Sequence, residues 1–340
     1  MVKVSIIIKA LNEESNIRRA IESSLAATAS LDGEVIIADS CSTDGTIEVA
    51  KRFPASIVQL RRADERCCGI GPQLGFQHSL GHYVYILDGD MELKADFLKK
   101  AVAILDSEPD VAGVGGYIHE MRVDNLEVKG RVKRHGRARP KSMLDVGCLN
   151  GGGLYRRAAI AAIGYLSDRN LYAFEEYDLG ARLRSKGWRL VLLKDKAVDH
   201  FSYEMGTWPL LWYRLCSGRF LSSGQLFRAA IRGHYAMQVL REVRTIPIDL
   251  GVWLYWACLV IASYEVGSRI FVLLGLAAPL ILMTIRTGSI KLALFSVLTW
   301  HISAIGFVIG FCKRRKQPAA LIESTVLQHA PAHRPIEIVN

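Results

Sequence analysis

The chain has 340 residues, half of them hydrophobic, and a formal net charge of +10. This length allows one large or two ordinary domains, and the hydrophobic fraction is high for a protein that is soluble throughout. Basic residues gather on both sides of a nearly all-apolar segment, residues 246–311. That arrangement fits an anionic membrane surface better than nucleic acid as the partner.

Strands and helices alternate in the first part of the chain. Residues 4–8 are a continuous apolar run, typical of a buried strand, and the capping residues 12–15 then begin a helix. Runs at 34–39 and 56–60 repeat the strand pattern, with a helix between them at 47–52. The alternation predicts an α/β fold in which a parallel sheet lies between two helical layers.

A run of five large apolar residues, Tyr83–Leu87, stops at Asp88, Gly89 and Asp90. The run predicts a strand buried on both faces. Two carboxylates a few ångströms apart repel each other unless a cation or a donor neutralises them, and Mg²⁺ or Mn²⁺ binds one or two carboxylates together with phosphate oxygens. We therefore predict a divalent metal at Asp88 and Asp90; the alternative is a solvated turn after a core strand.

Polar side chains follow several of these strands. Because ligands bind at the carboxyl edge of a parallel sheet, we expect the group from Asn12 to Glu14 to lie near Asp39 and near the two aspartates after the fourth strand. The chain has no GxxxxGK[ST] pattern and no GxGxxG after its first strand. ATPase and dinucleotide-binding functions are therefore disfavoured.

The second half carries candidate acceptor chemistry. The glycine-rich segment from Asn150 to Arg157 permits close backbone approach. A helix then opens with Glu175, Glu176 and Asp178 in its first turn, where the helix dipole favours acids. A carboxylate here could take a proton from an acceptor hydroxyl, although capping is the alternative for Asp178. His200 ends a strand near the same edge, and its neutral imidazole is a good ligand for Mn²⁺.

Four segments, residues 4–14, 37–46, 88–90 and 175–183, occur in the order found in a known family. Over about 200 residues the sequence resembles the inverting family 2 glycosyltransferases with the GT-A fold. Asp88-Gly89-Asp90 looks like their DXD motif, and Glu176 takes the position of their usual catalytic aspartate. Lys9 and Leu11 stand where proline and an aromatic residue are usual.

The resemblance implies a Rossmann-like nucleotide-diphospho-sugar transferase domain and transfer of a sugar with inversion at the anomeric carbon. It implies that Glu176 or Glu175 is the catalytic base. It also implies donor-binding residues (Ala10, Asn12, Glu14, Asp39, Arg66 and Asp88), metal ligands (Asp90, Asp88 and His200) and acceptor-binding residues (Gly152, Gly153, Asp178 and Arg182).

One departure from the family pattern concerns the number of sugars that are transferred. Processive synthases of this family carry a QxxRW segment before their membrane helices, and the nearest counterpart, residues 216–220, lacks the glutamine and the tryptophan. Transfer of one sugar is therefore favoured over polymerisation. As the leading hypothesis we expect a UDP-linked donor and a lipid-linked or cell-surface polysaccharide acceptor. One alternative is a polyprenyl-phosphate glycosyl synthase. Another is a non-catalytic membrane scaffold or regulator that retains the fold, which the intact acids argue against.

Nucleic acid is not expected as a partner, because the basic segment 129–141 contains no aromatic residue for stacking. An odd number of cysteines, seven, without zinc-type spacing indicates reduced cytosolic thiols. We thus expect the inner (cytoplasmic) membrane as the location, with the catalytic domain facing the cytoplasm.

The predicted domains follow these features. Residues 1–204 form the catalytic domain, 205–245 amphipathic interface helices, 246–312 two to three transmembrane helices, and 313–340 a basic, disordered tail. Apolar stretches run over about 246–263, 270–285 and 292–311. Three spans would put the basic tail opposite a cytosolic domain, against the positive-inside rule, so either one segment is re-entrant or interfacial or the tail is an exception.

Overall fold

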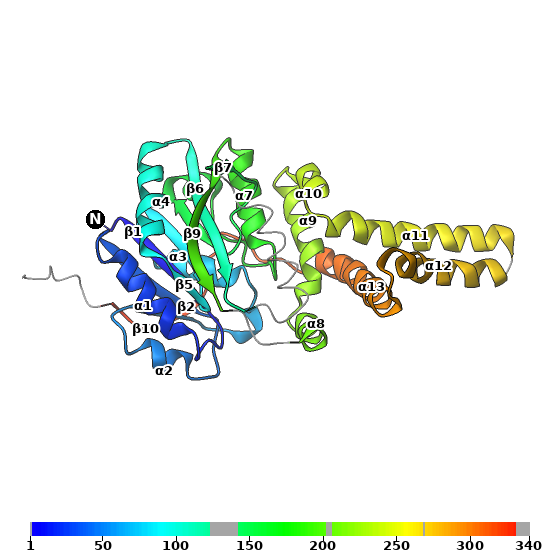
Figure 1. Cartoon of the computed structure of the whole chain (residues 1–340), viewed down its shortest axis with the longest axis horizontal. Helices are drawn as coiled ribbons and strands as arrows, with labels where there is room; N and C mark the ends of the chain where they lie inside the picture. Colours follow the sequence, from blue (N-terminus) through cyan, green and yellow to red (C-terminus); the bar gives the residue numbers. More distant parts are fainter. Residues whose placement is uncertain (1, 123–141, 202–205, 268, 331–340) are drawn as a thin grey trace, which may run out of the picture. The chain divides into compact units, whose positions relative to one another are not determined.

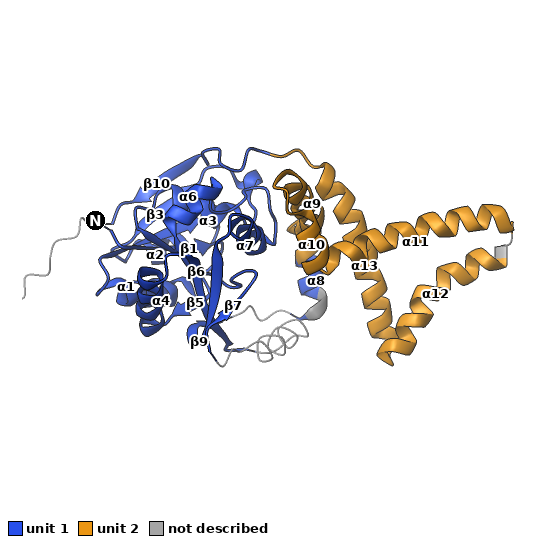
Figure 2. Ribbon diagram, turned by 90° about the horizontal axis from the view of Figure 1, so that it is seen from above, with its two compact units in different colours: residues 1–213, 316–340 blue, residues 214–315 orange. Residues whose placement is uncertain are grey.

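The computed structural model describes residues 2–122, 142–201, 206–267 and 269–330. The basic segment 129–141 lies outside them. The chain divides into two compact units: unit 1 contains residues 1–213 and 316–340, and unit 2 contains residues 214–315 (Figure 2). Unit 1 is therefore built from both ends of the chain.

Unit 1 is organised around one sheet with the strand order β10-β3-β2-β1-β4-β8-β6-β9-β5 (Figure 1). Its parallel part consists of the predicted apolar runs: β1 (Val4–Ala10), β2 (Gly33–Asp39), β3 (Ser56–Leu60) and β4 (Tyr83–Asp88). These strands are almost entirely buried because both of their faces are covered by helices.

The second half makes the sheet mixed rather than parallel throughout. β8 (Gly153–Arg156), in the glycine-rich segment, runs antiparallel between β4 and β6 (Val111–Glu120). β9 (Arg189–His200) is parallel to β6. The short strands β5 (Met91–Leu93) and β7 (Leu144–Asp145) both pair antiparallel with β9. β4, β6 and β9 consequently end at the same edge of the sheet.

Two hydrophobic clusters lie on opposite faces of the sheet. The first includes residues of α1 (Ile17–Thr28), α2 (Thr46–Ala50) and α4 (Ala95–Ser107). The second includes residues of α3 (Ile70–Gln77), α6 (Arg157–Ile163) and α7 (Glu175–Ser185). The predicted three-layer α/β arrangement is thus present, and it holds α7 against the sheet.

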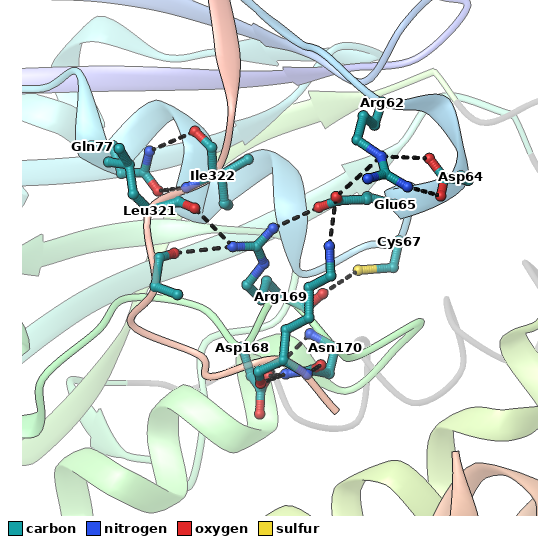
Figure 3. A network of polar contacts seen from close by, with 12 residues as sticks. Arg62, Asp64, Glu65, Cys67, Gln77, Asp168, Arg169, Asn170, Leu321 and Ile322 are labelled. Carbon is teal, nitrogen blue, oxygen red and sulfur yellow. Dashed lines mark hydrogen bonds and ion pairs between the residues drawn. The ribbon is translucent and has the colours of Figure 1, made fainter. Parts of the chain in front are cut away.

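The tail differs from the prediction of disorder after residue 313. β10 (Ser324–Gln328) pairs antiparallel with β3 at the edge of the sheet, and Ile322 is buried in the second hydrophobic cluster. Figure 3 shows the contacts that hold this segment: Arg169 donates to the backbone carbonyls of Ala320 and Leu321 at 3.1 and 3.0 Å. The prediction of disorder came from the basic residues alone, and a charge pattern carries no information on β3, the edge strand with which β10 pairs.

Unit 2 is helical and holds the apolar region. It begins within α8 (Thr207–Cys216) and continues through the 3₁₀ turn η2 (Arg219–Leu221) and the helices α9 (Ser222–Arg232), α10 (Ala236–Glu242), α11 (Thr245–Val266), α12 (Arg269–Thr287) and α13 (Ile290–Cys312). In the part of the chain that the structure describes, α11, α12 and α13 are the three helices long and apolar enough to cross a membrane.

Candidate active site

Three carboxyl ends of strands supply the centre of the candidate site. Asp88 ends β4, Glu120 ends β6 and His200 ends β9. Pairing between β5 and β9 sets Met91 opposite His200, which brings the preceding Asp90 beside the same imidazole. Residues far apart in sequence therefore meet because the strand register brings them to one edge of the sheet.

Asp90, His200 and Glu120 form a buried chain. His200 Nε2 lies 3.1 Å from Asp90 Oδ2, and its Nδ1 lies 2.9 Å from Glu120 Oε2. Burial lowers the pKa of His200, but the hydrogen bonds to Asp90 and Glu120 outweigh this effect and raise the pKa to about 10. The imidazole is thus held between two carboxylates in a fixed orientation.

The side chains of Asp90 and His200 are suitable ligands for a divalent metal ion. A carboxylate oxygen and a neutral imidazole nitrogen are suitable ligands for Mn²⁺, so a bound ion would replace the proton that His200 Nε2 shares with Asp90. A carboxylate on the far ring nitrogen is the usual support for a metal-binding histidine. Among the residues that the structure describes, no three His, Cys, Asp or Glu side chains form a ready-made metal cluster. Mg²⁺ and Mn²⁺ commonly take part of their ligands from substrate phosphates and water.

Asp88, the other predicted ligand, is bound to a lysine. Lys9 Nζ at the end of β1 lies 2.6 Å from Asp88 Oδ1 and 3.7 Å from Glu175 Oε1. Burial would lower the pKa of Lys9, but Asp88, Glu175 and Glu176 outweigh it and raise the pKa above its usual range. Lys9 therefore remains charged and links the strand end to the first turn of α7.

The two candidate bases point to different partners. Glu175 faces Lys9, whereas Glu176 Oε1 accepts a hydrogen bond of 3.1 Å from the backbone N–H of Gly152. Burial raises the pKa of Glu176 to about 7, with Lys9 lowering it and Glu175 and Asp88 raising it further. A carboxyl group with a pKa near neutrality is well matched to proton transfer.

Gly152 supports this contact through its backbone. Its φ is +92°, and a Cβ atom there would lie 2.0 Å from the carbonyl oxygen of Ile86 in β4. Only glycine permits this approach, so Gly152 brings an N–H group to Glu176. Its neighbour Gly153 is buried as the first residue of β8.

Asp178 and Arg182 lie away from solvent. Arg182 Nε donates to Asp178 Oδ2 at 2.7 Å, and the other guanidinium nitrogens donate to the backbone carbonyls of Tyr165 and Leu166. Asp178 is completely buried. These contacts lock α7 onto the segment after α6, and an acceptor could reach neither side chain without breaking them.

The predicted donor-binding residues near β1 hold two loops together. Asn12, with φ +57°, accepts a hydrogen bond of 2.8 Å from Thr43 N–H, and Glu14 Oε2 accepts one of 3.1 Å from Gly45 N–H. Ala10 is buried as the last residue of β1. The structure therefore places Asn12 and Glu14 beside the loop of residues 42–45, with their side chains hydrogen-bonded to its backbone.

Asp39 lies beneath the same loop. Its carboxylate is fully buried and accepts hydrogen bonds from the N–H and hydroxyl of Ser42 at 3.0 and 2.5 Å and from Gln59 at 2.9 Å. Arg66 crosses the loop and donates to the backbone carbonyl of Cys41. Asp39 thus shapes the turn that follows β2, and Arg66 places a positive charge above it.

Two residues of this site were absent from the predicted set. Glu120 lay at the start of a stretch predicted to be polar, with nothing in its surroundings to mark it as the support of a histidine 80 positions later. Lys9 was identified only as a departure from the family pattern. Its position directly after an apolar strand, like that of Asp39 and Asp88, was the signal that could have found it.

Comparisons with known proteins agree with the geometry. The model of the family "Glycosyl transferase family 2" matches residues 5–164. The succinoglycan biosynthesis protein ExoO of Rhizobium meliloti is 31% identical over 126 residues, which cover 37% of this chain and 33% of that protein. The putative glycosyltransferase EpsE of Bacillus subtilis is 28% identical over 197 residues, covering 55% of this chain and 68% of that protein.

A solved structure shares the fold. The mannosyltransferase PcManGT from Pyrobaculum calidifontis, in complex with GDP-Man and Mn²⁺, aligns over 91% of this chain and 87% of its own, with a TM-score of 0.58 and 18% identity. The match to ExoO spans only about a third of that relative's length. The apolar helices of this chain come in addition to the matched family region. The motifs, the fold and the family model agree that residues 5–164 form a glycosyl transferase family 2 region.

Proposed function

We propose that this protein is a membrane-anchored inverting glycosyltransferase. It moves one sugar from a nucleotide-diphosphate sugar, with UDP as the expected nucleotide, to a lipid-linked or cell-surface polysaccharide acceptor. The observation that carries the proposal is Lys9, whose ammonium group contacts both Asp88 and Glu175. The donor side of the site, at the end of β4, and the base side, at the start of α7, are thereby joined through one side chain.

The donor would lie along the carboxyl edge formed by β1, β2 and β4. Its nucleoside would contact loop 42–45 above Asp39, with Arg66 nearby for the negative charge of the diphosphate. Asp90 and His200 would hold a divalent metal there, which neutralises charge on the departing diphosphate. Glu120 keeps the His200 ring in the orientation that this role requires.

Glu176 is the proposed general base. Its carboxylate accepts the proton of the acceptor hydroxyl while that oxygen forms a bond to the anomeric carbon. The bond between the anomeric carbon and the diphosphate oxygen breaks on the opposite face, and its electron pair leaves with the nucleotide. The Gly152 N–H holds one carboxylate oxygen, so the carboxyl group is oriented before the acceptor arrives.

The acceptor class is inferred from two features. ExoO is named for succinoglycan biosynthesis, which concerns a polysaccharide. This chain also contains three helices long and apolar enough to cross a membrane in its described part. An acceptor carried on a lipid would present its sugar to a site tethered at the bilayer surface, and the cytoplasmic face of the inner membrane is where nucleotide sugars are expected.

The test is release of nucleoside diphosphate by the purified full-length protein. A panel of UDP-, GDP- and dTDP-linked sugars would be assayed with Mn²⁺ or Mg²⁺ and with membrane lipid extract as the acceptor source. Metal-dependent release from one donor, with the sugar recovered in lipid, is the expected result. Recovery of the sugar directly on polyprenyl phosphate would assign the polyprenyl-phosphate synthase activity instead.

Glu176→Gln supplies the sharpest variant. Glutamine still accepts the hydrogen bond from Gly152 but cannot take a proton, so we expect transfer to fall by about 10²- to 10⁴-fold while donor binding persists. Glu48→Gln, at an exposed position in α2, is the matched control. Near wild-type transfer by Glu176→Gln, together with loss in Glu175→Gln, would exchange the roles of the two glutamates.

A further inference from the structure

The chain returns to unit 1 after its apolar helices. Lys316 Nζ contacts Glu65 Oε1 at 2.5 Å, and Arg169 Nη2 contacts Glu65 Oε2 at 2.6 Å (Figure 3). Beyond them Ile322 is buried, with its N–H donating to Gln77 Oε1 at 2.9 Å, and β10 completes the sheet edge. This segment is an integral part of unit 1.

This return restricts how the apolar helices meet a bilayer. A folded unit lies on one side of the membrane, and the chain leaves it after Tyr213 and rejoins it at Lys316. α13 ends at Cys312, and the following four residues reach at most about 14 Å, well short of a hydrocarbon core of about 30 Å. The number of complete crossings is therefore even, although three helices are candidates.

Flanking charges indicate which helices cross. Basic residues precede α11 at Arg241 and Arg244, and two more flank the α12–α13 turn: Arg286 in the last turn of α12 and Lys291 in the first turn of α13. Four more follow α13 directly, at residues 313–316. If α11 and α12 cross, all of these lie on the side of unit 1, and only the turn between α11 and α12 is on the far side. If instead α11 and α13 cross, or α12 and α13 cross, Arg286 and Lys291 lie on the side opposite to unit 1, against the positive-inside rule.

Contacts within unit 2 agree with this assignment. α11 and α12 run in opposite directions and diverge from the turn between them, with the Tyr255 hydroxyl donating to the Gly275 carbonyl. α13 lies across their open end and packs on both of them (Figure 2). α13 meets the first half of α11: Trp253 Nε1 donates to the Ala304 carbonyl at 2.9 Å. The last turns of α13 do not continue along α11 but pack on η2 and α9.

The end of α13 is fixed among polar groups. Gly306 and Gly310 let the helix approach the backbone carbonyls of Phe220 and Leu221, because a Cβ atom there would lie only 2.2 and 2.0 Å away. Arg228 of α9 donates to the backbone carbonyl of Phe311 at 2.9 Å and to that of Lys313 at 2.7 Å. A guanidinium group at this position belongs to the boundary between lipid and water.

We infer that α11 and α12 cross the bilayer as a hairpin and that α13 lies within the leaflet on the side of unit 1 without crossing. α13 is one unbroken helix, so its backbone groups remain paired in lipid and no re-entrant break is needed. Its apolar side chains still meet acyl chains, since several are exposed in the protein: Leu292, Leu294, Leu298, Ile305, Val308 and Ile309. The anionic headgroups of that leaflet then meet the basic residues at both of its ends.

Single cysteines in a cysteine-free full-length protein test this topology without reference to catalysis. Lys51→Cys reports the side of unit 1, Glu265→Cys the α11–α12 turn, Lys291→Cys the start of α13, and Glu323→Cys the returning tail; all four positions are exposed. Each variant would be treated with a membrane-impermeant maleimide in sealed vesicles of both orientations. Labelling in detergent provides the measure of complete reaction.

The expected result is that Lys51→Cys, Lys291→Cys and Glu323→Cys react from one side and Glu265→Cys from the other, with at least a tenfold preference in each. Reaction of Glu323→Cys from the side opposite to Lys51→Cys would mean three crossings and would overturn the inference. Reaction of all four variants from one side would mean that α11 and α12 do not cross. Reaction of Lys291→Cys from the same side as Glu265→Cys would mean that the second crossing helix is α13 and not α12. Either result would reject the inferred topology.

Discussion

Lys9 is the side chain on which the charges of the site depend. It lies between Asp88 and Glu175, and together with Glu176 these acids form a group of like charges around a single ammonium. Like charges at such distances raise one another's pKa, and a cation among them opposes that rise. Lysine at a position where proline is usual thus gives this chain a fixed positive charge at its catalytic edge.

Replacing Lys9 should change the pH profile more than the fold. In Lys9→Met the cation that lowers the pKa of Glu176 is lost, so the acid limb of kcat/KM should move to higher pH. Lys9→Arg keeps the charge and should restore the limb to near its original position. The measurement is transfer rate against pH for the three proteins. An unshifted limb in Lys9→Met would mean that Lys9 does not act on the base.

The wild-type profile follows from Glu176 itself. Burial raises the pKa of Glu176 from its ordinary value to about 7, and only the deprotonated form can accept a proton. Transfer should therefore be full above about pH 8 and fall roughly tenfold per pH unit below about pH 6. Donor binding, followed by calorimetry over the same range, serves as the control, and a flat transfer profile between pH 5 and 8 would contradict the assignment.

Replacement of Asp90 tests whether its carboxylate is a metal ligand. Asp90→Ala removes the carboxylate that contacts His200 from the turn between β4 and β5, and it leaves the apolar residues of both strands in place. We expect the Mn²⁺-dependent part of donor affinity to disappear in calorimetry while circular dichroism is unchanged. Glu92→Ala, whose carboxylate contacts Lys94 directly after the same strand, is the matched control. Metal-dependent affinity that persists in Asp90→Ala would exclude Asp90 as a ligand.

For single residues, the sequence predicts which side chains belong to the site more readily than which side chains they contact. Asp88, Asp90 and His200 could be predicted because each follows an apolar strand, and the structure places them on one edge. The contact of His200 with Glu120 could not, since it depends on the register of β6 against β9. Asp178 was predicted as an acceptor ligand from its place in a motif, but the structure shows it buried beside Arg182.

At the level of elements, β10 is an edge strand supplied from outside the family region. It covers β3, whose backbone groups would otherwise be unpaired at the sheet edge. Ile322, just before it, is 1% exposed, whereas its neighbour Leu321 is 78% exposed. This difference between adjacent aliphatic residues provides a direct test of how firmly the segment is attached.

Ile322→Ala should destabilise unit 1, because it leaves a cavity in the second hydrophobic cluster. A buried Ile-to-Ala change costs about 2 to 5 kcal/mol, which should appear as a lower unfolding temperature and faster proteolysis of the tail. Leu321→Ala removes a side chain that is mostly in solvent and should change neither measurement. Equal effects of the two substitutions would show that the tail is not docked in solution as it is in the structure.

The elements differ in how well the sequence predicts them. β1, β2, β3 and β4 are buried on both faces, and their apolar runs were predicted almost residue by residue. β8 was not predicted as a strand, because its glycine-rich segment indicated only close backbone approach; pairing with β4 on one side and β6 on the other makes it one. β10 is half-exposed and short, so long-range pairing rather than local pattern forms it.

At the scale of the whole molecule, unit 2 is an insertion within unit 1. The chain leaves the catalytic unit once and rejoins it once, so the two units have separate cores. A flexible linker of about 30 residues, with an average span of roughly 30 Å, could replace residues 214–315. The catalytic unit then keeps both of its own segments.

We expect this shortened protein to be soluble, to hydrolyse donor in a metal-dependent way, and to lose transfer to a lipid-linked acceptor. Solubility would be measured by sedimentation without detergent, and activity by nucleoside diphosphate release. The same protein truncated before Lys316, and therefore lacking β10, is the control and should aggregate. If the shortened protein is insoluble while its sheet is complete, the two units depend on each other for folding.

Because unit 1 is built from both ends of the chain, its sheet is completed only late in synthesis. β3 is made early, but β10 follows only after residues 61–323 have been translated, which takes about 13 to 50 s at ordinary synthesis rates. During that interval α11, α12 and α13 leave the ribosome while the edge of β3 has no partner. Membrane insertion thus precedes completion of the catalytic sheet, and a delay in insertion lengthens the period in which this open edge can pair with another chain.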